Sequence, residues 1–222
     1  MSFEVDTSKI HMRHIAIFCL GFSLVAAASC NSSNPDSVKE AQKTNSENTD
    51  SLDKKKSVTD SSTAVPSKQD ADFMVKAAAG GMFEVELGKL AQTNGARQGV
   101  KDFGAMMVRE HGQGDGKIRS LATGKQIVLP MELSNDQKKE WSDLSKKHGA
   151  EFDRAYITLM VKDHKDDIDE FGKAAKDAND GDIKAFAHNT LPMLQHHLDS
   201  AQSLDKAIGK KLSGPKTAPP YQ

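Results

Sequence analysis

The sequence predicts an all-α protein whose folded part is a four-helix bundle with a short extra helix between the second and third long helices. Four long segments carry apolar residues at helical spacing. The alternation of apolar and polar residues that is typical of half-buried strands is essentially absent. Two of the connections are short and one is longer, which favours a bundle of antiparallel neighbours.

The first two predicted helices cover residues 71–93 and 96–124. The first has a stripe of apolar and small residues from Phe73 to Ala91, and an Asn-Gly turn at Asn94 ends it. The second has Val100 and further apolar residues in heptad spacing. Both stripes are wide enough for a core-facing surface.

The long connection contains a predicted helix of its own over residues 135–147. Ser134 can serve as its N-cap, and Gln137 stands at the third helical position, which is the pattern of a capping box. Trp141 and Leu144 would then cover the bundle. We interpret this lone tryptophan as a packing residue.

The third and fourth long helices are predicted over residues 150–178 and 182–209, with the Asn-Asp-Gly-Asp turn between them. The fourth contains Pro192, which predicts a kink because proline cannot donate to the helix ladder.

The N-terminal region is typical of an exported protein. The stretch from Met12, MRHIAIFCLGFSLVAAASC, has a short basic start, an apolar run and small residues at its end. We therefore expect residues 1–29 to contain a signal peptide, and we interpret Met12 as the true start of translation, with residues 1–11 upstream of it. Its end resembles the lipobox of bacterial lipoproteins, with Cys30 as the lipid attachment site. Because Ala27 stands where many lipoboxes have leucine, cleavage by an ordinary signal peptidase is the alternative.

The remaining segments follow from composition. Residues 30–69 carry the lipidated cysteine and have few large apolar residues, which predicts a disordered linker. The bundle domain spans 70–212, and residues 213–222 form a disordered tail. Asn31 after the anchor is compatible with sorting to the outer membrane. We therefore expect a lipid-anchored protein of the bacterial cell envelope that faces the periplasm.

The charge balance bears on partners. The chain has 30 basic and 31 acidic residues, giving a formal net charge of −1 without a basic block. This distribution argues against nucleic acid as a partner. The expected partners are the membrane, through the lipid anchor, and either another envelope protein or a second copy of the chain.

A repeated pair of methionine and histidine provides the candidate site. The segments MVREH, MVKDH and MLQHH each place methionine four residues before histidine, so the two side chains share one helix face. The candidate metal ligands are Met107, His111, Met160, His164, Met193 and His197.

The three histidines are predicted to meet in one layer of the core. His164 and His197 lie at similar distances from the turn between their helices, and His111 joins them if the connector brings the end of its helix beside the start of the next. Glu84 is expected about 9 Å away along the axis, facing Met107, although a drift of one turn would bring it into the layer.

Further residues flank this layer. Glu84, Glu110, Asp163 and His196 are candidates for extra ligands or for hydrogen-bond partners that orient the imidazoles.

Two interpretations of the layer remain open. In one, the imidazoles bind a transition metal ion, Cu, Zn or Fe, with methionine beside histidine best suited to Cu(I). In the other, methionine fills irregular gaps and each histidine is a structural core residue bonded to a carboxylate, in a non-catalytic structural or interaction module. Burying three imidazoles together without a shared partner costs about 1–3 kcal/mol per unmet hydrogen bond, which favours a shared ligand.

Four blocks of the chain carry a resemblance to a known family. The blocks FMVKAAAGGMFEVELGKLA, VKDFGAMMVREHGQGDGKIRSLA, FDRAYITLMVKDHKDDIDEF and LPMLQHHLDSA are similar to those of the bacterial domain of unknown function 4142 family, whose members are often labelled outer membrane proteins. The resemblance covers about residues 70–211. It implies a ferritin-like four-helix bundle in the envelope and says little about activity.

Enzyme chemistry has little support in the sequence. Di-iron carboxylate bundles need a Glu-x-x-His motif on two helices, and no acidic residue stands three positions before any histidine of this chain. The predicted domain also lacks cysteine and any clear nucleophile constellation. We therefore expect a protein without catalytic residues.

Overall fold

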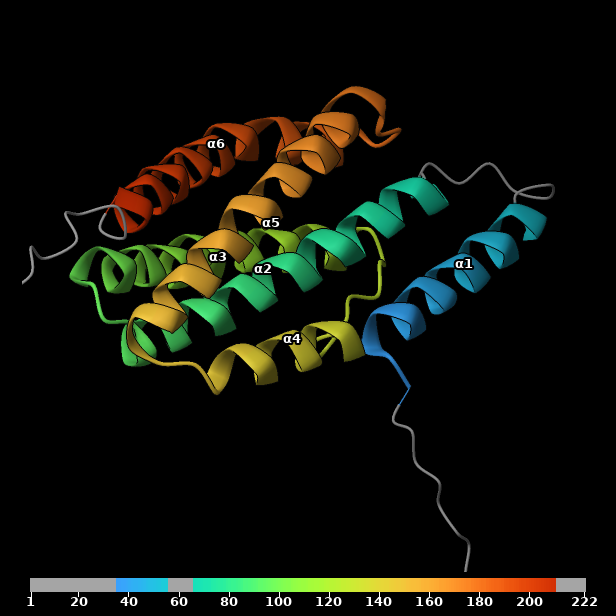
Figure 1. The fold of residues 1–222 in the computed structure, drawn as a ribbon. Helices are drawn as coiled ribbons and strands as arrows, with labels where there is room; N and C mark the ends of the chain where they lie inside the picture. Colours follow the sequence, from blue (N-terminus) through green and yellow to red (C-terminus); the bar gives the residue numbers. More distant parts are fainter. Residues whose placement is uncertain (1–34, 56–65, 211–222) are drawn as a thin grey trace, which may run out of the picture. The chain divides into compact units, whose positions relative to one another are not determined.

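The computed structural model describes residues 35–55 and 66–210. These form six α-helices, and within this part the chain has no β-strand beyond one isolated bridge between Gly95 and Gly149. The helices are α1 (Ser37–Lys55), α2 (Lys68–Asn94), α3 (Gln98–Gly124), α4 (Asn135–Ser145), α5 (Gly149–Asp177) and α6 (Gly181–Lys210), as Figure 1 shows. The predicted all-α bundle with a short extra helix is confirmed.

Several predictions fall on residues outside the described ranges. These are the signal peptide at 1–29, the lipid attachment at Cys30 and the tail at 213–222. Across the helices that are described, none combines the length and apolar character needed to cross a membrane.

Two helix pairs build the bundle, α2 with α3 and α5 with α6. In the first pair, glycines let the backbones approach closely: a Cβ added to Gly104 would lie 2.6 Å from the Cβ of Ala91, and one added to Gly88 would lie 2.6 Å from the carbonyl oxygen of Gly104. The two pairs meet through contacts of α2 with α5 and of α3 with α6.

The connector between α3 and α5 runs from one end of the bundle to the other. At one end, Lys125 Nζ donates to Asp180 Oδ2 at 2.6 Å, so α3 ends beside the turn between α5 and α6. At the other end, the bridge between Gly95 and Gly149 places the start of α5 beside the turn between α2 and α3. The end of α3 and the start of α5 are therefore not side by side, contrary to the condition we set for the histidine layer.

Helix α4 forms where the capping box predicts it. Ser134 Oγ accepts from Gln137 N at 3.1 Å, and Gln137 Oε1 accepts from Ser134 N at 3.0 Å. Leu144 is buried, and Trp141 packs against the same apolar cluster, in agreement with the predicted packing role.

Helix α1 corrects part of the predicted disordered linker at 30–69, because Ser37–Lys55 is helical, while residues 30–34 and 56–65 lie outside the described ranges. Asn45 holds it to the connector, because its side chain donates to Val128 O and accepts from Val128 N, both at 2.8 Å. Asp36 Oδ2 accepts from Asn135 N at 2.8 Å, and Ala41 is buried. Polar side chains bonded to backbone groups thus fix a segment whose apolar content is low.

The core consists of two apolar clusters. One gathers buried residues from the first half of α2, the second half of α3 and the α5–α6 turn region. The other gathers those from the second half of α2, the first halves of α3 and α5, and the end of α6. Buried polar residues, Glu84 and three histidines, lie at intermediate positions along these helices.

Candidate metal centre

The polar layer receives one side chain or more from each long helix of the bundle. Glu84 comes from α2, His111 from α3, His164 from α5 and His197 from α6. All four are buried, with exposed fractions of 1%, 6%, 0% and 0% respectively. Because each histidine lies near the middle of its helix, the three share a layer whichever ends the connector joins. The predicted convergence of the histidines is confirmed.

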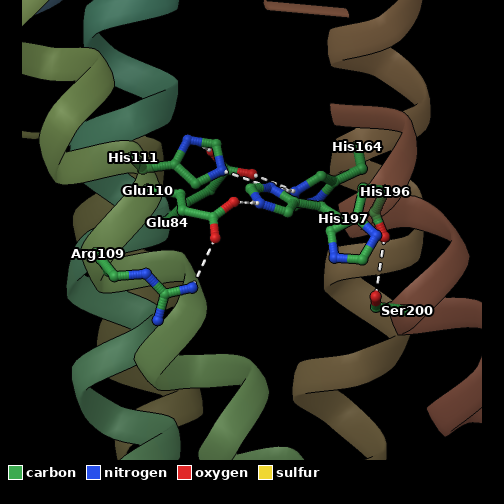
Figure 2. Close-up of polar contacts among 8 residues, drawn as sticks. All are labelled: Glu84, Arg109, Glu110, His111, His164, His196, His197 and Ser200. Atoms are coloured by element: carbon green, nitrogen blue, oxygen red, sulfur yellow. Dashed lines mark hydrogen bonds and ion pairs between the residues drawn. The ribbon is translucent and has the colours of Figure 1, made fainter. Parts of the chain in front are cut away.

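The imidazoles turn one nitrogen each toward a common point (Figure 2). His111 Nε2 lies 3.2 Å from His197 Nδ1, and His164 Nε2 lies 3.3 Å from the same atom. The three histidines can offer nitrogens that all lie within 4.8 Å of one another. Such a group could hold a metal ion.

The opposite nitrogen of each imidazole faces an oxygen. His197 Nε2 donates to Glu110 Oε2 at 2.8 Å, and His164 Nδ1 donates to the carbonyl oxygen of Met160 at 3.0 Å. His111 Nδ1 lies 2.8 Å from Glu84 Oε2. These oxygens favour a proton on each outward nitrogen. In a neutral imidazole the inward nitrogen then carries a free lone pair, and a metal ion binds to that lone pair.

Glu84 lies within the layer, which corrects the expectation that it would be about one and a half turns away. Its Oε1 is 3.3 Å from His164 Nε2, and this buried oxygen has no hydrogen-bond partner. The alternative of a one-turn drift was the right one. Counting residues from the turns was too coarse to place it, because helices in a bundle are tilted and shifted along their axes.

The carboxylate of Glu84 and the imidazoles of this layer shift one another's pKa. Burial raises the pKa of Glu84, but the charges of His111 and His164 outweigh burial, so the pKa is lower than usual. Burial lowers the pKa of His111, yet the Glu84 carboxylate outweighs it and the pKa is raised. Burial dominates at His164 and His197, and it lowers the pKa of His197 to about 4. At neutral pH the latter two imidazoles are therefore uncharged.

The methionines of the repeated motif lie on two sides of the layer. Met107 and Met160 are fully buried in the cluster that contains Phe103, while Met193 packs, partly buried, against the other cluster. Met160 reaches His164 through its backbone carbonyl. The structure gives these side chains packing contacts, and their role as metal ligands stays a prediction.

The other flanking residues differ in position. Glu110 orients His197, and Arg109 holds Glu110 at 2.6 Å. Asp163 is partly buried; burial, followed by the charge of Glu84, raises its pKa to about 7. His196 is exposed beside His197.

Two parts of the site were missed by sequence reasoning. Arg109 had a visible signal, because it directly precedes Glu110. The carbonyl oxygen of Met160 had none in the side-chain pattern, although a donor four residues later on a helix can reach it.

The spacing of the inward atoms fits a small cation. Zinc bonds to histidine nitrogen at about 2.0–2.1 Å in tetrahedral sites, which separates neighbouring ligand atoms by about 3.3 Å. The contacts from His197 Nδ1 to the other two imidazoles, and from His164 Nε2 to Glu84 Oε1, are 3.2, 3.3 and 3.3 Å. Two of the three nitrogen–nitrogen separations therefore match a tetrahedral metal site, and all three nitrogens lie within 4.8 Å of one another, so the group could hold a metal ion.

Comparison with protein families matches residues 55–204 with the family described as a domain of unknown function, DUF4142. No curated protein and no solved structure matched the chain.

Proposed function

This chain belongs to the DUF4142 family, and we propose that it is a non-enzymatic metal-binding protein that holds a transition metal ion through His111, His164 and His197. The metal classes that fit imidazole ligands are Zn(II), Cu and Fe. The carboxylates of Glu84 and Glu110 and the carbonyl of Met160 orient the three rings. The inward lone pairs of the three rings point toward one place in the core. A metal ion bound there would supply the positive charge that they can coordinate.

One observation carries this proposal: hydrogen-bond acceptors converge in the buried layer with too few donors. His164 is neutral, and its proton is used by Met160 O, so His164 Nε2 presents a lone pair. That lone pair faces His197 Nδ1 and Glu84 Oε1, both at 3.3 Å. Since each unmet buried acceptor costs about 1–3 kcal/mol, a cation at this point would relieve a clear penalty.

The competing function is a structural or interaction module. It is favoured by the three outward nitrogens, which all face oxygens, and by the raised pKa of His111. A protonated His111 can donate from Nε2 to His197 Nδ1, which satisfies one inward contact at 3.2 Å. It leaves His164 Nε2 and Glu84 Oε1 without donors, and for that reason we prefer the metal.

We further propose the place of action. The apolar run from Ile15 to Ala28 followed by Cys30 supports a lipoprotein of the cell envelope, anchored to the outer membrane and facing the periplasm. The near-neutral charge supports a role without nucleic acid. Mass spectrometry of the protein from its native membrane tests the anchor: an acylated peptide beginning at Cys30 is expected, and an unmodified cysteine would refute it.

The metal proposal is tested by calorimetric titration of the metal-free full chain with Zn(II), Co(II), Cu(II) and Cu(I), together with elemental analysis. We expect one ion per chain, lost when His164→Gln and His197→Asn are combined. His196→Ala is the matched control, because His196 is adjacent to His197 but exposed, and this variant should bind like the natural chain. Binding that survives the double variant, or no binding by the natural chain, would support the structural alternative.

A further inference from the structure

The two helix pairs are related by an internal repeat with a shift of 83 residues. Under this shift the end of α2 at Asn94 corresponds to the end of α5 at Asp177, and the start of α3 at Gln98 corresponds to the start of α6 at Gly181. Residues that are buried in both copies include the equivalent pairs Val100 and Ile183, Gly104 and Ala187, and Ala91 and Ala174.

Two buried aspartates show that the repeat is a pseudo-twofold arrangement. Asp153 of α5 accepts from Ala96 N at 2.9 Å and from Arg97 N at 3.0 Å, in the turn between α2 and α3. Its equivalent, Asp70 of α2, accepts from Asn179 N and Asp180 N, both at 3.0 Å, in the turn between α5 and α6. Each donor and acceptor of the first contact differs by 83 in residue number from its counterpart in the second. Each helix pair thus supplies an aspartate to the turn of the other, as a twofold axis requires.

Applied to the metal centre, this pseudosymmetry identifies a second position in the core. The shift relates Glu84 to Asp167, His164 to Gly81, His197 to Gly114 and His111 to Leu194. The second position therefore keeps a carboxylate but has glycine at two places where the first has imidazole.

A cavity of about 30 Å³ lies at this second position. Its lining includes all four equivalent residues, Gly81, Gly114, Asp167 and Leu194, together with Glu84 and His111 of the first site. A Cβ added to Gly114 would meet nothing within 4 Å, so this glycine is not required by packing. The volume suffices for one or two particles of the size of water.

The lining of this cavity has the charge that a cation needs. Glu84, with 1% exposure, lines it from α2; its oxygen without a hydrogen-bond partner is Oε1, which also faces His164 Nε2 at 3.3 Å, so the two sites would share this atom. Asp167 lines it from α5, where burial and then the charge of Glu84 raise the pKa of Asp167 well above its usual range. Glu84 is buried and Asp167 is partly buried, and a cation held by both carboxylates would offset their mutual repulsion.

Building on the proposed function, we propose that this cavity binds a second divalent cation through the oxygens of Asp167 and Glu84. The imidazole of His111 also lines the cavity, but its Nδ1 faces Glu84 Oε2 at 2.8 Å, so carboxylate oxygens are the ligands on offer. Such oxygens favour a hard ion such as Mn(II) or Mg(II) over the softer ions suited to the histidine site. The core then contains two unlike cation positions, one rich in nitrogen and one rich in oxygen, with Glu84 between them.

The test uses the purified full chain, freed of metal, loaded with one equivalent of Zn(II) and then titrated with Mn(II). Free Mn(II) is followed by its electron paramagnetic resonance signal. We expect one bound Mn(II) per chain, at least tenfold weaker binding in Asp167→Asn, and a similar loss in Gly114→Leu, which fills the cavity. Asp166→Asn is the matched control, because Asp166 is the exposed neighbour of Asp167.

The two proposals fail separately in this experiment. If Zn(II) binds at the histidines but the loaded chain takes up no Mn(II), or if Asp167→Asn binds Mn(II) like the natural chain, the second position is refuted while the first stands. If Zn(II) itself does not bind, the proposed function fails at the first step. Thermal unfolding of each variant, followed by circular dichroism, confirms that loss of Mn(II) is measured on folded protein.

Discussion

Removing the Asp153 side chain should destabilise the bundle without affecting metal binding. The carboxylate, which is 1% exposed, accepts from Ala96 N and Arg97 N and so serves the N-terminus of α3. The N-cap residue Arg97 supplies no side-chain hydrogen bond of its own. Asp153→Ala therefore leaves two donors at a helix start without their acceptor.

The magnitude follows from these two bonds. A hydrogen bond to a charged group contributes about 1.5–3 kcal/mol, so two give about 3–6 kcal/mol. Ala96 is exposed, and water can replace its bond, which brings the expected loss to about 3 kcal/mol. Against a typical stability of about 5–15 kcal/mol, this is a large fraction.

The assay is urea unfolding of the metal-free chain at neutral pH, followed by circular dichroism. Asp153→Asn keeps one acceptor oxygen and should lose about half as much as Asp153→Ala. Asp166→Ala, at an exposed position of the same helix, should change little. A loss below about 1 kcal/mol in Asp153→Ala, or equal losses in the two Asp153 variants, would refute the stabilising role of the hydrogen bonds to Asp153. Metal affinity should stay unchanged because Asp153 lies at the end of the bundle.

Three further predictions concern other parts of the chain. Asn45→Ala removes both bonds to Val128, and hydrogen exchange should become faster throughout α1 while the bundle helices keep their protection; unchanged exchange in α1 would contradict this. Gly116→Ala should raise the free energy of unfolding by about 1 kcal/mol in urea titration, because a Cβ there meets nothing within 4 Å and alanine favours the helix. The unfolded chain binds a proton at His197 below pH 6.5, but the folded chain does so only near pH 4. The stability of the metal-free chain should therefore fall by at most about 3 kcal/mol as the pH is lowered from 6.5 to 4. His197→Asn should remove that part of the pH dependence.

The sequence predicted the long helices and the histidine layer because both depend on regular spacing. Apolar periodicity placed each long helix within a few residues, and the capping box placed α4 at Asn135. The three histidines His111, His164 and His197 could be assigned to the same height along the bundle because each lies near the middle of its helix. The helices and the cap are local in the chain, whereas placing His111 in the layer also assumed that the end of α3 lies beside the start of α5. That assumption is wrong, but the layer does not depend on it.

The features that sequence reasoning missed depend on contacts between distant segments. Helix α1 is fixed by the bonds of Asn45 to Val128, which a composition rule based on apolar content does not count. Glu84 contacts His111 and His164 of two other helices, and its height in the bundle depends on how α2 packs against α3, where Gly88 and Gly104 let the backbones approach closely. The internal repeat is hidden because its copies differ at most positions, including those of the two glycines and their histidine equivalents.

The broken pseudosymmetry bears on the choice between a structural and a metal-binding layer. If the histidines only filled the core, the equivalent space on the other side of the axis would be expected to be filled as well. It is left as a cavity of about 30 Å³, at a cost of about 0.7 kcal/mol by the usual dependence of stability on cavity volume. The pattern thus departs from the best packing on both sides of the axis, with acceptors facing each other on one side and glycines beside the carboxylates of Glu84 and Asp167 on the other. A pair of cation positions explains both departures together, whereas a packing role explains neither.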